Sequence, residues 1–138
     1  MRTITDSFGR VWTIKLDCKR AIAIRSTCGV DLLSFKNVDK LFTTLLEDFS
    51  IALKVAWEML EPADKRPEFE EFSTYFRGDS LEKLIENVFQ ECIDFFPFEK
   101  MRKALRAGWE RSRNELEKAF QAIEEKFQQS EPLPTTSG

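Results

Sequence analysis

The C-terminal third of the chain carries one long run of apolar residues spaced three and four positions apart, with a polar gap at Ser112. The run comprises Phe98, Met101, Leu105, Trp109, Leu116, Phe120, Ile123 and Phe127. This spacing predicts an amphipathic helix of about thirty residues, which is about 45 Å long at a rise of 1.5 Å per residue. Such a helix is longer than the core that the rest of the chain can build. We therefore expect its distal half, residues 110–128, to project from the body or to pack against a partner.

The N-terminus has the pattern of a β-hairpin. Residues 1–5 and 10–16 flank the turn Asp6–Gly9, which has Asp early and Gly late. One face of the second strand is apolar and consists of Trp12, Ile14 and Leu16. An isolated hairpin is marginally stable in water, so we expect helices to cover this face and Trp12 to anchor the hairpin to them.

Three capping residues predict three helices after the hairpin. Asp17 is expected to cap a helix that reaches Cys28 and stops at Gly29. Asn37 and Asp48 are expected to cap the next two helices. The helices capped by Asn37 and Asp48 have apolar residues at helical spacing.

Two aromatic-rich helices are predicted after a loop between Pro62 and Pro67. The first is a short amphipathic helix over residues 68–76. The second is expected to begin with Asp79 or Ser80 as its cap, and Pro97 interrupts it and starts the long final helix.

These elements together predict a mainly α fold of the α+β class. The 138 residues, 42% of them hydrophobic, can build one core without disulfides or metals. We expect an N-terminal β-hairpin packed on a bundle of five or six helices, the last one long. A single domain is predicted over residues 1–128, with residues 129–138 as a disordered tail.

The composition disfavours an enzyme. The chain has no His, which excludes the Ser-His-Asp and Cys-His machineries and imidazole acid–base chemistry. Its three cysteines lack the spacing of metal ligands, and no glycine-rich phosphate loop is present. We expect no catalytic residue, no metal and no cofactor. The start of the chain has no signal-peptide pattern and no apolar run approaches the ~18 residues of a membrane span, so a cytoplasmic protein is expected.

The stretch FQECIDFFPF, residues 89–98, has two possible interpretations. Its aromatic residues can belong to the core and to an elbow between two helices at Pro97. Alternatively, they form a partly exposed apolar patch that receives a partner segment. On the second interpretation, the partner-binding residues on the elbow and the distal helix are Phe95, Phe96, Phe98, Trp109, Leu116, Phe120, Ile123 and Phe127.

A basic segment lies next to the elbow, although the net charge of the whole chain is −3. Its cations are Lys100, Arg102, Lys103, Arg106, Arg111 and Arg113. They could contact a nucleic-acid backbone, but they spread around the polar side of one helix. An ordinary solvated face, paired with the acidic segment at residues 61–96, is the favoured interpretation.

Four segments of the chain resemble small phage tail assembly chaperone-like proteins from prophage-type tail modules. They are DSFGRVWTI (6–14), GVDLLSF (29–35), LEDFSIALKVAWEML (46–60) and FEEFSTYFRGDSLEKLIENVFQECIDFFP (69–97). The similarity covers residues 3 to about 105. It implies a small, mostly helical protein of the bacterial cytoplasm that lacks catalytic residues. Its implied role is to bind the tape-measure protein or an unassembled tail-tube subunit before assembly.

Two other functions remain open from the sequence. The C-terminal helix could be the oligomerisation arm of a homo-oligomeric structural or adaptor protein. Less favoured is a nucleic-acid-binding regulator that uses the basic segment at 100–113.

Overall fold

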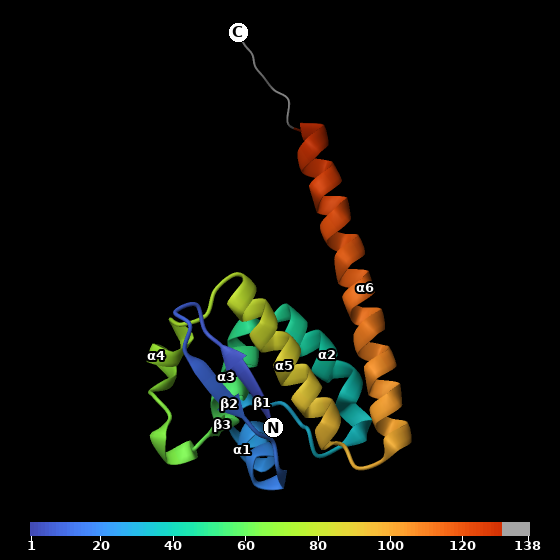
Figure 1. Ribbon diagram of the computed structural model, residues 1–138. Helices are drawn as coiled ribbons and strands as arrows, with labels where there is room; N and C mark the ends of the chain where they lie inside the picture. The colour runs from blue at the N-terminus through green and yellow to red at the C-terminus, as the bar shows by residue number, and fades with distance from the viewer. Residues whose placement is uncertain (131–138) are drawn as a thin grey trace.

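The computed structural model (Figure 1) describes residues 1–130, except for the side chains of residues 37–39 and 130. The elements in chain order are β1 Arg2–Thr5, β2 Val11–Ile14, α1 Cys18–Cys28, the 3₁₀ helix η1 Phe35–Asn37, α2 Val38–Glu47, α3 Phe49–Glu58, β3 Leu60–Glu61, the 3₁₀ helix η2 Ala63–Lys65, α4 Phe69–Ser73, α5 Asp79–Phe95 and α6 Glu99–Ser130. The predicted mainly α fold, with an N-terminal hairpin and a long final helix, is confirmed.

The hairpin is the larger part of a three-stranded antiparallel sheet, in the order β1-β2-β3. Trp12 pairs with Ile4 across the hairpin, and Ile14 pairs with Leu60 of the third strand. The sequence prediction missed β3 because two residues between a helix and a proline loop carry no alternation that would mark a strand.

Asp6 organises the hairpin turn. Its buried carboxylate accepts hydrogen bonds from the backbone N–H groups of Phe8 and Arg10 at 2.8 and 3.0 Å. It also accepts from Nε of Arg10 at 3.0 Å and from the indole Nε1 of Trp12 at 2.9 Å. Burial alone would raise the pKa of Asp6, but these hydrogen bonds and the Arg10 charge outweigh burial and lower it.

Trp12 attaches the hairpin to the segment around α4, as expected. Its half-buried ring meets the buried ring of Phe72 edge-on at 5.4 Å and stacks on Tyr75 at 6.0 Å. The Ser7 N–H also donates to the carbonyl oxygen of Tyr75 at 2.8 Å. Aromatic contacts and a backbone hydrogen bond therefore join the turn of the hairpin to the α4–α5 connection.

The predicted helix boundaries hold for two caps. Asp17 accepts from the N–H of Arg20 at 2.9 Å, and Asp48 accepts from the N–H of Ser50 at 3.1 Å. Gly29 ends α1 with a φ of 72°, a left-handed conformation that glycine adopts without strain. The side chain of Asn37, the third expected cap, lies outside the described part of the chain.

The predicted cap of α5 is wrong. Gly78 occupies the N-cap position, and no side chain caps the helix there. The Ser80 hydroxyl accepts from the Arg77 N–H at 3.0 Å and so belongs to the preceding turn, and the helix starts at Asp79. The preceding helix α4 is also shorter than predicted and ends at Ser73.

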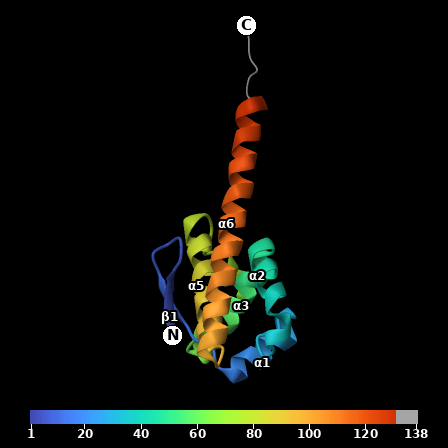
Figure 2. The same cartoon turned by 90° about the vertical axis from the view of Figure 1, so that its right-hand side faces the viewer.

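The long helix α6 packs on the body only with its first half. Figure 2 shows this half in front of α5 and α2, the two helices that it packs against most extensively. Leu105 and Trp109 are buried there, whereas residues 117–129 are all exposed and extend beyond the body (Figure 1). The exposed part begins later than the expected residue 110 because Ser112, Arg113 and Leu116 are still half-buried. The expected disordered tail falls mainly on residues 131–138, outside the described residues, and Gln129 and Ser130 belong to α6.

Three buried rings fix α6 on the two helices below it. Phe89 of α5 stacks on Trp109 at 4.0 Å between ring centroids, and Phe42 of α2 stacks on Phe89 at 5.3 Å. Gly108 lets α2 and α6 approach closely, because a Cβ atom added there would lie 3.0 Å from the Phe42 ring. We call Phe42, Phe89 and Trp109 the ring cluster.

The Gly108→Ala variant should therefore be less stable than the wild type. Alanine favours the helix by about 1 kcal/mol, but overpacking against a ring held by two neighbours costs roughly 1–3 kcal/mol. Chemical denaturation measures the difference. In a Phe42→Leu background the same substitution should become neutral or stabilising. A higher unfolding midpoint for Gly108→Ala in the otherwise wild-type protein would contradict this account of the packing.

Candidate partner-binding surfaces

The elbow between α5 and α6 does not expose all the aromatic residues predicted there. Phe96 is 3% exposed and Trp109 is 4% exposed, so both belong to the core and not to a partner-binding surface. The chain leaves α5 at Phe96 in an extended conformation, and this ring meets Phe35 at 6.4 Å and Phe95 at 6.1 Å. Phe95 is half-buried, and Phe98 is 67% exposed.

A half-open apolar hollow of about 290 Å³ lies at the elbow. It is lined by Cys18, Leu32, Leu33, Phe35, Phe95, Phe96, Pro97 and Met101. No charged side chain lines it, so it can take up an apolar group but offers no ion pair to orient one.

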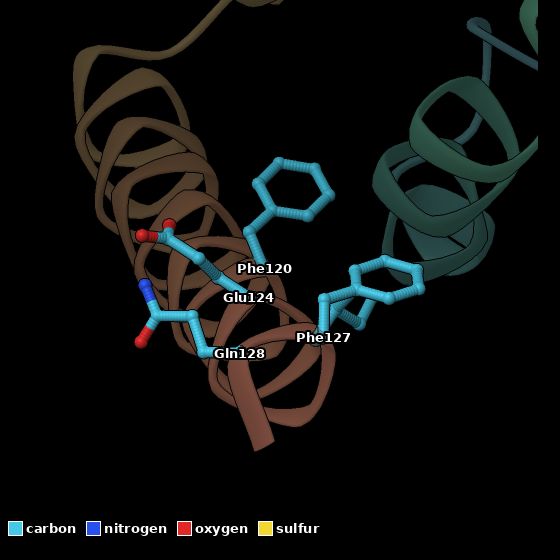
Figure 3. A pocket seen from close by; sticks show the side chains of 5 residues that line it. Phe120, Glu124, Phe127 and Gln128 are labelled. Atoms are coloured by element: carbon cyan, nitrogen blue, oxygen red, sulfur yellow. The ribbon is translucent and has the colours of Figure 1, made fainter. Parts of the chain in front are cut away.

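The second surface is the far end of α6. Phe120 is 57% exposed, Ile123 is 50% exposed and Phe127 is 69% exposed, and Leu116 is half-buried at the edge of the body. Figure 3 shows the rings of Phe120 and Phe127 projecting from one side of the helix, and the polar ends of Glu124 and Gln128 pointing away from the rings. We call Leu116, Phe120, Ile123 and Phe127 the exposed stripe.

The exposed stripe continues the face by which α6 packs on the body. Leu105, Leu116 and Phe127 are eleven residues apart, and so are Trp109 and Phe120. An eleven-residue repeat has 3.67 residues per turn, close to the 3.6 of a straight helix, so the stripe does not drift around α6. In this repeat Ser112 occupies the position equivalent to Ile123. The apolar pattern therefore continues through this position and is interrupted only by the serine side chain.

The predicted partner-binding residues therefore fall into three places. Phe96 and Trp109 lie in the core, Phe95 and Phe98 lie at the elbow, and the exposed stripe lies at the other end of α6. At 1.5 Å per residue, the start of α6 and Phe120 are about 30 Å apart along the helix. The elbow and the stripe are therefore two surfaces, and one short partner helix does not cover both.

Several cations of the basic segment are engaged within the chain. Arg102 donates to the carbonyl oxygen of Phe96 at 2.8 Å. Arg106 pairs with Asp94 of α5 at 2.8 Å, and Arg113 pairs with Glu86 of the same helix at 3.3 Å. This pairing of the basic segment with the acidic one is the arrangement favoured by the sequence.

Three buried carboxylates were not predicted from the sequence, since nothing in a local pattern distinguishes them from surface residues. Glu58 accepts hydrogen bonds from Thr27 at 2.9 Å and Arg66 at 3.2 Å. Glu91 accepts from the N–H of Leu16 at 3.1 Å, and Asp6 is bonded as described above. Every one has hydrogen-bond partners, which is typical of structural carboxylates. Within residues 1–130, no group of three Cys, Asp or Glu residues could hold a metal ion.

The buried thiol of Cys92 is unsuited to nucleophilic chemistry. Burial raises its pKa far above the usual range, and the neighbouring Glu91 carboxylate adds to this effect. A protonated, inaccessible thiol is an inert core residue.

In the part of the chain that the structure describes, no helix is long and apolar enough to cross a membrane. No protein-family model, no curated protein and no solved structure matches the chain.

The elbow can be tested with a pair of neighbouring substitutions. Phe96→Asp places a charge in the core and should cost roughly 3–5 kcal/mol of stability. Phe98→Asp should not destabilise the protein, because the side chain is exposed and Asp is a favoured residue at this N-cap position of α6. Thermal unfolding followed by circular dichroism distinguishes the two. Equal stability of both variants would show that Phe96 is not a core residue.

Proposed function

We propose that this protein is a non-enzymatic binding protein that holds an amphipathic helix of another chain on the exposed stripe of α6. The observation that carries the proposal is the exposure of Phe120 and Ile123 on the same face that is buried at Leu105 and Trp109. Apolar helix faces of this kind recognise partner helices by anchors three and four residues apart. Large aromatic side chains supply most of the energy of such interfaces.

The stripe suits temporary holding of a client. Each fully buried Phe or Ile side chain contributes about 1.5–3 kcal/mol, and a few such side chains must offset the loss of freedom on association. The expected affinity is therefore moderate, which allows a client to be handed over later.

We further propose that the client is a tail protein, either the tape-measure protein or an unassembled tail-tube subunit. The proposed role is therefore that of a phage or prophage tail assembly chaperone in the bacterial cytoplasm. The resemblance in the segments between residues 3 and about 105 favours this assignment. The absence of His from the whole chain and the hydrogen-bonded state of the buried carboxylates favour a protein without catalysis.

A nucleic-acid-binding function is less well supported. Three of the arginines that would contact phosphates, Arg102, Arg106 and Arg113, already bind carbonyl or carboxylate oxygens of this chain. To contact phosphates, these arginines would have to give up their hydrogen bonds and ion pairs within the chain.

The proposal is tested by co-expressing the full chain with the tape-measure protein or the tail-tube subunit of the same tail module. Phe120→Glu should weaken the purified complex by about tenfold or more, because it places a charge in the apolar contact. The matched control is Gln121→Glu, which adds the same charge on another side of the exposed helix.

Calorimetric titration of the separately purified proteins gives the dissociation constants. Both variants should keep the unfolding midpoint of the wild type, since both positions are exposed. Failure of the wild type to bind either tail protein would refute the chaperone assignment. Equal binding by the two variants would refute the role of the exposed stripe.

A further inference from the structure

One edge of the packing face of α6 carries charges at a fixed spacing. Arg106 and Arg113 are seven residues apart on α6, and their partners Asp94 and Glu86 are eight residues apart on α5. The two helices are joined by a short elbow and run in opposite directions (Figure 1). Arg106 and Arg113 on this edge of α6 thus form ion pairs with acidic residues of α5.

Beyond the body, the charges on this edge of α6 are acidic. Glu117 and Glu124 are also seven residues apart, and at 100° per residue they lie within about 40° of Arg106 and Arg113 around the helix. Both glutamates are exposed, and neither forms an ion pair within residues 1–130. The exposed stripe therefore has an acidic edge on the side that α5 occupies in the first half of the helix.

We propose that the occupant of the exposed stripe is a basic amphipathic helix of another protein. Its apolar residues pack on Phe120 and Ile123, and Lys or Arg residues on one edge pair with Glu117 and Glu124. This inference rests on the proposed function and adds the chemistry of the client. Within the chain, arginines of α6 pair with carboxylates of α5. In the proposed complex, glutamates of α6 pair with Lys or Arg residues of the client.

The same charges disfavour a second copy of this chain as the occupant. Two exposed stripes packed antiparallel about Phe120 place Glu117 of one copy beside Glu124 of the other, and like charges there oppose association. A parallel pairing in register brings Glu117 and Glu124 near Ser112 and Ala119, which are uncharged. Neither arrangement gives the glutamates an opposite charge.

Two synthetic peptides of about three heptads test the inference. Both have Leu on one face, and they differ only in carrying Lys or Glu along one edge of that face. Fluorescence anisotropy with the full chain at low ionic strength should show about tenfold tighter binding of the Lys peptide. Glu124→Lys should reduce this preference to about threefold, and Glu117→Lys with Glu124→Lys should reverse it.

The matched control is Glu125→Lys, which makes the same change in charge on the opposite side of the helix. It should leave the preference for the Lys peptide close to that of the wild type. An equal loss of preference in Glu124→Lys and Glu125→Lys would mean that only net charge attracts the peptide, and the inference would be overturned.

Three other results would also overturn it. One is equal binding of the two peptides, and another is binding of neither peptide. The third is a wild-type dimer in sedimentation that Phe120→Glu dissociates, which would make a second copy the occupant. In the first two cases, binding of a tail protein that Phe120→Glu weakens would leave the proposed function intact.

Discussion

The stack of Phe89 on Trp109, with ring centroids 4.0 Å apart, joins α6 to the body of the protein. The hairpin lies on α5, and α5 carries Phe89, so sheet, bundle and final helix meet through one central helix. Phe42 completes the ring cluster from α2, at a point where Gly108 removes the side chain that would separate the helices. The direction in which α6 leaves the body, and hence the position of the exposed stripe, depends on this contact.

An eleven-residue apolar repeat makes the exposed stripe a continuation of the core. The body covers the face of α6 at Leu105 and Trp109, but α5 begins only at Asp79 and α2 ends at Glu47. No further helix of the described chain reaches the part of α6 beyond Leu116 (Figure 1). An amphipathic face that is left exposed is the physical basis of the proposed partner-binding function.

Local patterns in the sequence predicted much of this fold. The hairpin, the caps at Asp17 and Asp48 and the long helix follow from interactions within a few residues of one another. The sequence left open whether Phe96 is buried in the core or exposed on a patch, because its burial depends on Phe35, about sixty residues away in the chain and adjacent only in the folded protein. The exposed stripe was predictable from apolar spacing, whereas the ion pairs of Arg106 and Arg113 depend on the register between α5 and α6.

Hydrogen–deuterium exchange along α6 tests most directly whether the exposed stripe is a docking surface. In the free protein, the amides of residues 117–129 should exchange much faster than those near Leu105 and Trp109, because the side chains of residues 117–129 are exposed. On binding of the proposed tail-protein client, protection should appear in residues 117–129, with little change near Leu105. Strong protection of residues 117–129 in a dilute, monomeric sample, or no gain of protection in the complex, would contradict this account.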